Sequence, residues 1–221
     1  VVALQEVEGD APLPELDADY VFVGSAPATA TRGHVHLYVR RGLAYERVTL
    51  AEGLPCVAAR VKVADDSDGD KASGDRVMYV VATHLPSGDR KGERREMVRR
   101  AIGACPDPAS VLIAGDCNAR DDEVADWCEA FHLYDAHYRG VSWGAQGNRR
   151  FYSNAEYTGG GLRLDRAMGG RRMCVEAHLV AQGKVFFEGH SFHMSDHFGL
   201  LVFVDVGNVF ASRSRVDEGA K

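Results

Sequence analysis

The chain has 221 residues, of which 45% are hydrophobic and 26% charged, and its formal net charge is −6. A chain of this length and apolar content can bury one substantial core, and two-sheet α/β sandwiches of this size commonly form one domain. The negative net charge argues against a protein that coats nucleic acid through bulk electrostatics, because phosphate binding needs a positive surface. No apolar segment approaches the length needed to cross a bilayer, so we expect no membrane association.

The five cysteines are odd in number, scattered, and contain no Cys-x-x-Cys pair. This pattern favours reduced, packed thiols over a disulfide framework. We therefore expect a protein of the cytosol or the nucleus.

The first predicted strand contains Glu6, a carboxylate within the otherwise apolar run Val1–Val7. The second, residues 33–40, carries His34 and His36 on one face. Two histidines on one strand face could bind zinc, but no third ligand is evident, so we do not expect a metal there.

The strand Val77–Val81 is followed directly by Thr83 and His84. A helix is predicted next, because Met97, Val98, Ala101 and Ile102 recur at the spacing of one helix face. The arginines and the lysine in and before this helix, Arg90, Lys91, Arg94, Arg95, Arg99 and Arg100, are interpreted as a solvated face in preference to a nucleic-acid patch.

The run Val111–Ala114 predicts a strand covered on both faces, and Gly115 bounds it. Side chains alternate along a strand, so Asp116 and Asn118 point to one side while Cys117 points to the other. An aspartate beside an amide can take a proton from water while the amide holds a neighbouring oxygen. The alternative is an ordinary turn, since Asp and Asn favour turns.

Two further clusters follow. Asp165 lies between apolar Leu164 and Ala167, and Ser195-Asp196-His197 precedes the strand-like run 198–204. A single histidine or acid near a strand end is more often structural than functional. Five such clusters together form an oxygen-rich set that suits Mg²⁺ or Mn²⁺ better than zinc.

These clusters resemble, in order, the motifs of the endonuclease/exonuclease/phosphatase superfamily. The matching segments are Leu4-Gln5-Glu6-Val7, Thr83-His84-Leu85, Gly115-Asp116-Cys117-Asn118, Arg163-Leu164-Asp165-Arg166 and Ser195-Asp196-His197. The longer segments Asn118–Val124, Val141–Trp143, Leu162–Arg166 and Ser195–Leu201 are most similar to the tyrosyl-DNA phosphodiesterase 2 branch. The resemblance extends from Val1 to about Val206.

The resemblance implies an α/β (α+β) fold, a four-layer α/β/β/α sandwich of two mixed sheets. Residues 1–206 would form the catalytic domain, and residues 207–221 a polar tail. Members of this superfamily open with a strand carrying an Asn and a helix, whereas the printed sequence starts on the Glu6 strand. Without that strand we expect an unpaired sheet edge and weakened activity, to be tested against an N-terminally extended chain.

By position, the resemblance implies that Glu6 and Asp196 bind the metal ion, Mg²⁺ or alternatively Mn²⁺. Asp116 would position or deprotonate the attacking water, and Asn118 would help to hold the phosphate and the nucleophile. His197 would contact the scissile phosphate, Asp165 would orient His197, and His84 would be a further histidine on the phosphate side.

Substrate contacts are implied for Arg120, Trp143, Arg163 and Leu164. Arg120 offers a planar fork for phosphate oxygens. Trp143 and Leu164 match an apolar wall against a nucleic-acid strand, although Gly144 departs from the polar residue expected after the Trp, and Leu164 has no aromatic face. Arg149 and Arg150 are placed to steer a strand.

The leading hypothesis is a Mg²⁺-dependent monomeric enzyme that hydrolyses 5′-phosphotyrosyl bonds at single-stranded DNA ends left by trapped topoisomerase. One alternative is a general DNA or RNA nuclease, or another phosphohydrolase, of the same superfamily. An alternative of another class is an inactive domain that binds nucleic acid or a protein partner.

Overall fold

The structure, a computed structural model, describes residues 1–28, 33–63, 76–143, 161–180, 185–187, 190–192, 197 and 199–206, with the backbone alone for 185–187 and 190–192. The described strands are β1 (Val2–Glu8), β2 (Tyr20–Pro27), β3 (Gly33–Arg40), β4 (Tyr45–Val48), β5 (Cys56–Val63), β6 (Arg76–His84), β7 (Val111–Asp116), β8 (Leu133–Asp135), β9 (Asp165–Gly170), β10 (Cys174–Val180), β11 (Val185–Phe187), β12 (His190–Phe192) and β13 (Gly199–Asp205). The described α-helices are α1 (Lys91–Gly103) and α2 (Asp121–Phe131), and Pro14–Leu16 and Pro108–Ser110 form short 3-10 helices. None of the described helices is long and apolar enough to span a membrane.

The larger sheet has six strands in the order β4-β5-β6-β7-β9-β8. Strands β6 and β7 run parallel, and every other neighbouring pair in this sheet runs antiparallel. The predicted strand at Val111–Ala114 is the first part of β7. Side chains alternate along it, so that Ile113 packs under the helices and Leu112 packs against the smaller sheets. The apolar run is therefore buried on both faces, as its sequence indicated.

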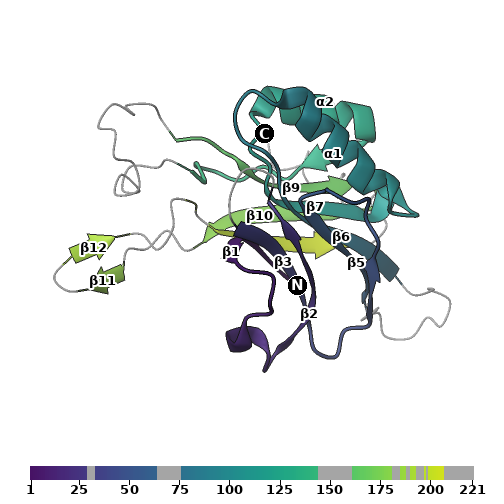
Figure 1. Cartoon of the computed structure of the whole chain (residues 1–221). Coiled ribbons are helices and arrows are strands. Elements are labelled where there is room, and N and C mark those ends of the chain that lie inside the picture. The colour runs from purple at the N-terminus through teal and green to yellow at the C-terminus, as the bar shows by residue number, and fades with distance from the viewer. Residues whose placement is uncertain are drawn as a thin grey trace, which may run out of the picture.

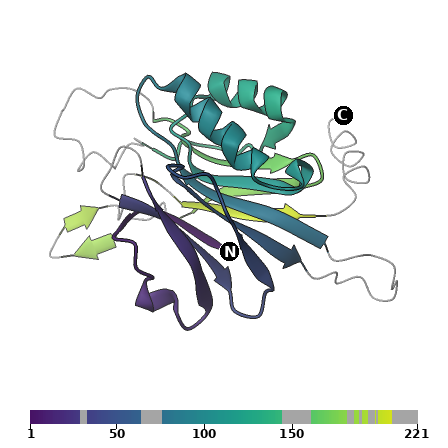
Figure 2. The same cartoon turned by 45° about the vertical axis from the view of Figure 1, so that its right-hand side comes forward.

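Helices α1 and α2 cover one face of the larger sheet (Figure 1). Helix α1 packs through Met97, Val98, Ala101 and Ile102, the residues whose spacing predicted it. The opposite face of the sheet packs against a second β layer, made of the β1-β3-β2 sheet and the β10-β13 pair (Figure 2). These layers confirm the predicted α/β fold with two packed β layers and are consistent with the predicted four-layer sandwich; both α-helices that the structure describes lie on the outer face of the larger sheet.

A buried ion pair joins the two helices. The side chains of Arg94 and Glu123 are 2% and 5% exposed, and Arg94 Nη2 lies 2.7 Å from Glu123 Oε1. Arg94 also donates hydrogen bonds of 2.8 Å to the carbonyls of Pro86 and Gly88. Its guanidinium group therefore anchors the segment that leaves β6 as well as helix α2.

The strand register gathers polar residues at one edge of the larger sheet. His84, the last residue of β6, pairs with Asp116, the last residue of β7. Asp116 pairs in turn with Asp165, the first residue of β9. The parallel strands end at this edge and the antiparallel strand begins there, so three residues that are far apart in the chain lie side by side.

Gly115 allows β7 to approach β6 closely just before Asp116. Its φ is +136°, a conformation that strains residues with a side chain. A Cβ at this position would lie 2.2 Å from the carbonyl oxygen of Thr83 and 2.9 Å from Gln5 Nε2. Both contacts are too short, so any side chain here would push the strands apart beside the pair of His84 and Asp116.

We predict that Gly115→Ala lowers the free energy of unfolding by at least about 2 kcal/mol, because the added methyl group combines a backbone clash with strain. Gly92→Ala is the matched control: Gly92 lies in α1, and a Cβ there would meet nothing within 4 Å. Urea unfolding should show no loss for the control. Equal stability of the two variants would contradict the explanation.

Candidate active site

Asp116 is at the centre of the polar cluster. Its carboxylate is buried, and His84 Nε2 lies 3.3 Å and His197 Nε2 lies 3.9 Å from Asp116 Oδ2. A buried carboxylate is costly unless other groups stabilise its charge. Two imidazoles next to one acid meet this need and form a compact unit that can hold or move a proton.

His197 is oriented by Asp165. The Nδ1 of His197 lies 2.8 Å from Asp165 Oδ2, and this hydrogen bond is partly buried. Because a carboxylate only accepts, Nδ1 must carry the proton and donate it, which leaves Nε2 on the side of Asp116. The structure thus brings together three predicted site residues, Asp116, Asp165 and His197, whose ligand atoms all lie within 4.8 Å of one another.

Asn118 fixes the orientation of Asp116. Its backbone N–H donates to Asp116 Oδ1 at 2.8 Å, and its side-chain Nδ2 donates to Asp116 Oδ2 and to the carbonyl of Leu85, both at 2.9 Å. Asn118 has a φ of +47°, which Asn tolerates better than most residues. Both N–H groups of the amide are therefore used inside the protein, and within the described ranges no hydrogen bond to its side-chain carbonyl oxygen is formed.

Glu6 reaches the same cluster from the other sheet. Its φ is +57°, and the pairing of β1 with β3 shifts register between Leu4 and Val7. Such a bulge redirects a side chain. Gly33 on β3 makes the bulge possible, because a Cβ there would lie 2.6 Å from the Cα of Glu6. The Glu6 carboxylate is half exposed and lies 4.0 Å from His84 Nε2, on the open side of the cluster.

The predicted substrate contacts have different surroundings. Arg120 is exposed at the start of α2, where its backbone carbonyl accepts a 3.0 Å hydrogen bond from Val124, and its side chain makes no hydrogen bond or ion pair with any residue that the structure describes. Trp143 is half buried, and its backbone pairs with Leu162 and with His197. Leu164 is buried, at 8% exposure. Arg149 and Arg150, and the predicted metal ligand Asp196, lie outside the described residues, and the roles of all these residues stay predictions.

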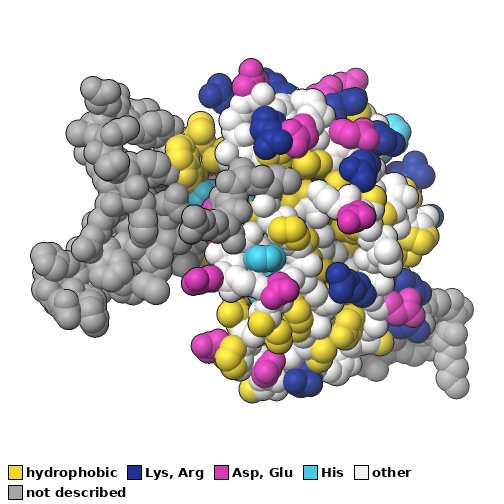
Figure 3. All heavy atoms as spheres, in the orientation of Figure 1, with side chains coloured by type: hydrophobic (Ala, Val, Ile, Leu, Met, Phe, Trp, Pro, Cys, Tyr) yellow, Lys and Arg dark blue, Asp and Glu magenta, His cyan; other side chains and the backbone are white. Residues whose placement is uncertain are grey.

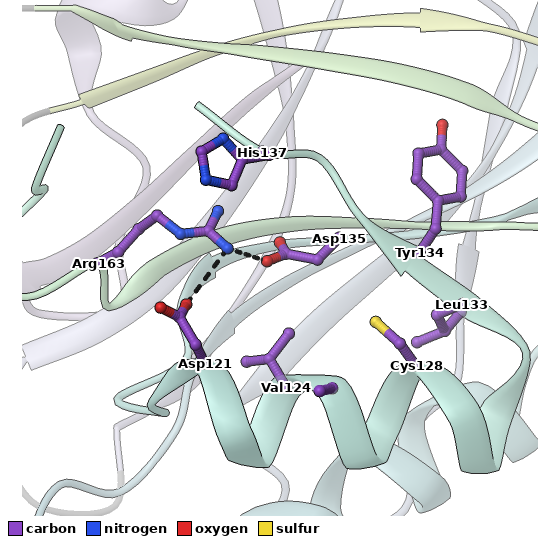
Figure 4. A pocket seen from close by; sticks show the side chains of 9 residues that line it. Asp121, Val124, Cys128, Leu133, Tyr134, Asp135, His137 and Arg163 are labelled. Atoms are coloured by element: carbon purple, nitrogen blue, oxygen red, sulfur yellow. Dashed lines mark hydrogen bonds and ion pairs between the residues drawn. The ribbon is translucent and has the colours of Figure 1, made fainter. Parts of the chain in front are cut away.

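Arg163 pairs with Asp121 and Asp135 (Figure 4), and Arg166 pairs with the same two acids. It also stacks on the ring of Tyr138, with 4.9 Å from its Cζ to the ring centroid. The fully buried Arg166 donates to the carbonyl of Ala119 as well. The network therefore holds the loop that carries Asn118 and Arg120 against β9. Sequence reasoning gave Arg166 no role, although a second arginine directly after Asp165 was a signal.

The same network borders a pocket of about 430 Å³ between α2 and β8. Arg163 points into it between two acids, and the apolar side chains of Val124 and Cys128 form its wall on α2 (Figure 4). Among the predicted site residues only Arg163 lines this pocket. The pocket thus lies beside the histidine and carboxylate cluster and not over it.

The charged face of α1 is neutralised by acids. Lys91 pairs with Asp122 and Arg95 with Asp126, both on α2, and Arg99 pairs with Glu96 within α1. Positive and negative side chains accordingly alternate over the helices (Figure 3). This agrees with the interpretation of the α1 arginines as a solvated face, except for Arg94, for which that interpretation was wrong: its side chain is buried and pairs with Glu123.

One of the two histidines on β3, His36, has a structural explanation. His36 is fully buried, with Nδ1 3.1 Å from the hydroxyl of Tyr38 and Nε2 3.0 Å from the carbonyl of Gly9. Both ring nitrogens of His36 are thus already engaged within the protein.

The largest single influence on the pKa of His84 is burial of the ring, which lowers it, and the charge of His197 lowers it as well. The hydrogen bond and charge of Asp116 and the charge of Glu6 raise the pKa, and together they bring it above its ordinary value. The protonated form is therefore favoured in the folded protein. It contributes stability below the unfolded-state pKa, and this contribution is lost as the pH rises through the folded-state pKa.

We predict that Asp116→Asn lowers the pKa of His84 in the metal-free protein, because it removes the main influence that raises this pKa while the burial remains. Titration of the imidazole signals by NMR measures the shift. Asp126→Asn, at an exposed pair with Arg95, is the control and should leave the pKa unchanged. A His84 pKa that stays the same in Asp116→Asn would show that Asp116 does not stabilise the imidazolium.

Comparisons with known proteins identify the fold. The family model described as "Endonuclease/Exonuclease/phosphatase family" matches residues 1–197. A comparison with curated proteins gives no match.

Three solved structures illustrate the similarity. TDP2 of D. rerio, complexed with a single-strand DNA product, has a TM-score of 0.59 and 16% identity over 91% of this chain and 84% of that one. Truncated TDP2 of Caenorhabditis elegans has a TM-score of 0.58 and 19% identity over 90% and 82% of the two chains. The endonuclease/exonuclease/phosphatase of Beutenbergia cavernae has a TM-score of 0.51 and 19% identity over 93% and 62%. The chain, matched by the family model over residues 1–197, belongs to the endonuclease/exonuclease/phosphatase family, whose members are hydrolases acting on phosphodiester bonds.

Proposed function

We propose that this protein uses water to hydrolyse a phosphodiester bond at the cluster around Asp116, and that its substrate is a 5′-phosphotyrosyl bond at a single-stranded DNA end. The observation that carries the proposal is the arrangement of one buried carboxylate, Asp116, between two imidazoles, with Asn118 fixing its orientation and Asp165 orienting His197. Such a unit can accept a proton from water and present a cationic donor to a phosphate.

In the proposed reaction Asp116 takes the proton of the attacking water, and the carbonyl oxygen of Asn118 helps to orient that water. His197 presents Nε2 to a phosphoryl oxygen, and Asp165 favours its cationic form by accepting the Nδ1 proton. His84, whose pKa is raised, offers a second positive group on the same side. These groups together stabilise the negative charge that builds on the phosphorus oxygens.

The donor set fits a hard divalent cation. Carboxylate oxygens are the ligands that Mg²⁺ prefers, and Mn²⁺ accepts the same set. Because Asp165 and His197 already bond to each other, we assign the ion to the half-exposed Glu6 and, from the family resemblance, to Asp196. When bound, Mg²⁺ would neutralise charge on the phosphoryl oxygens and on the leaving group.

The substrate proposal rests on three supports. The D. rerio TDP2 with a similar fold is complexed with a single-strand DNA product. Arg120 is exposed beside the cluster as a cation for phosphate, and Trp143 pairs with His197 where a base could stack. A phenolate leaves more readily than an alkoxide because tyrosine has a pKa near 10, so strong protonation of the leaving group is unnecessary.

We predict preference for a 5′-tyrosyl single-stranded DNA over an abasic duplex and over an RNA of equal length, measured as kcat/KM. Faster cleavage of either comparator would replace the substrate assignment with the general nuclease alternative. In the same assay Trp143→Ala should raise KM roughly 5-fold to 150-fold, since stacking contributes about 1–3 kcal/mol per base. Phe203→Ala, at an exposed aromatic on β13, is the control and should leave KM unchanged.

We predict that Asp116→Asn lowers kcat by about 10²-fold to 10⁴-fold, the usual contribution of a general base. A chelator should abolish wild-type activity, and Mg²⁺ or Mn²⁺ should restore it. Asp122→Asn is the control. Asp122 lies on α2 in an exposed ion pair with Lys91 of α1, and this variant should retain full activity. Hydrolysis that survives in Asp116→Asn would support the alternative in which the cluster is catalytically idle and the domain only binds.

A further inference from the structure

Ser142 lies fully buried behind the pair of Asp165 and His197. Its relative exposure is 0%. Its Oγ accepts two hydrogen bonds from consecutive backbone N–H groups, those of Leu164 at 3.1 Å and Asp165 at 3.0 Å. A buried N–H without a partner is costly, and at zero exposure bulk water cannot replace the hydroxyl. Ser142 therefore fixes the backbone from which the Asp165 carboxylate projects.

The opposite side of the same residue is also held. The hydroxyl of Tyr138 donates a 2.7 Å hydrogen bond to the backbone carbonyl of Asp165. The peptide groups on both sides of Asp165 thus bond to side chains from the segment 138–142. This segment precedes Asp165 by more than twenty residues, so the contact is tertiary.

The residues next to Ser142 connect it to His197. The backbone N–H groups of Ser142 and Trp143 both donate to the carbonyl of Leu162 at 3.0 Å, and Leu162 donates back to the carbonyl of Trp143 at 2.8 Å. On its other side Trp143 forms an antiparallel bridge with His197. Ser142 and Trp143 therefore lie between the two chain segments that must meet for the imidazole to bond to Asp165.

We propose that Ser142 is a positioning residue for the pair of Asp165 and His197, and that it acts on catalysis through the hydrogen bond between them. This inference rests on the proposed hydrolytic function of the site. Ser142 touches neither imidazole nor carboxylate in the contacts above. Ser142 holds the backbone of Asp165 close to Trp143, and Trp143 pairs with His197. In this position the 2.8 Å hydrogen bond between His197 and Asp165 can form.

The kinetic test compares Ser142→Ala, Ser142→Cys and Ser142→Thr. Removal of the acceptor in Ser142→Ala should lower kcat roughly 10-fold to 100-fold with KM nearly unchanged, because small misplacements of catalytic groups cost this much. Ser142→Cys keeps a side-chain atom at the position of the hydroxyl, although sulfur is larger and a weaker acceptor, and should be intermediate, whereas Ser142→Thr keeps the hydroxyl and should retain most of the activity. Ser110→Ala is the control, because it removes a buried hydroxyl at the other end of β7.

A double mutant separates positioning from a general loss of structure. In an Asp165→Asn background, Ser142→Ala should lower kcat little further, because both changes disable the same pair. Equal loss in both backgrounds, or no loss in the single variants, overturns the proposal. If Ser142→Ala does not fold, Ser142→Cys is used in its place.

A crystallographic test does not depend on any substrate. In the metal-free Ser142→Ala or Ser142→Cys protein, the distance from His197 Nδ1 to Asp165 Oδ2 should exceed hydrogen-bond range, and in Ser110→Ala it should not change. An unchanged distance in the Ser142 variants overturns the proposal. If the wild-type protein hydrolyses none of the substrates, the proposed function fails, and this measurement still decides whether Ser142 positions the pair.

Discussion

The register of three neighbouring strands is the constraint on which the rest of the site depends. Strands β6, β7 and β9 place His84, Asp116 and Asp165 in one row across the sheet edge. A slip of one residue in any strand would turn its side chain to the opposite face. The apolar alternation of β7, with Ile113 under the helices and Leu112 against the smaller sheets, fixes that register. Burial of ordinary aliphatic residues thus determines the geometry of the polar cluster.

The charges of the cluster are balanced locally. Asp116 is buried among donors from Asn118, His84 and His197, so its negative charge is stabilised without a cation from the protein surface. The arginines of α1 are largely occupied by acids, and Arg163 and Arg166 are occupied by Asp121 and Asp135. In a protein with a net charge of −6, the positive groups for the proposed binding of a phosphate are therefore local: the imidazoles of the cluster and the exposed Arg120.

The strand and helix with a regular local pattern of apolar residues could be predicted from the sequence. The apolar run before Asp116 and the spacing of Met97, Val98 and Ala101 predicted β7 and α1, because burial patterns of regular elements appear in the chain itself. The order of the motifs predicted the family. The bulge at Glu6 could not be foreseen, because it depends on the approach of Gly33 from another strand.

Ser142 and Arg166 lie within matched motifs, but the sequence predicted no role for either residue. Their importance comes from tertiary hydrogen bonds to Asp165 and Ala119, and the neighbouring residues in the chain do not identify those partners. The burial of Leu164 likewise results from packing that its motif does not encode. Hydrophobic periodicity reports which face of an element is inside, whereas the partner of a buried polar group is set by the tertiary arrangement.

Glu6 is carried by the smaller sheet, while His84, Asp116 and Asp165 belong to the larger one. The site is therefore assembled across the plane where the two β layers meet, and the aliphatic residues in that plane, such as Val35, Leu37 and Val80, act as a spacer between its halves. Enlarging or trimming this spacer would change the gap between the Glu6 carboxylate and the imidazoles without touching a polar atom. Substitution of these buried aliphatic residues is therefore one route to changing the affinity of the proposed metal site.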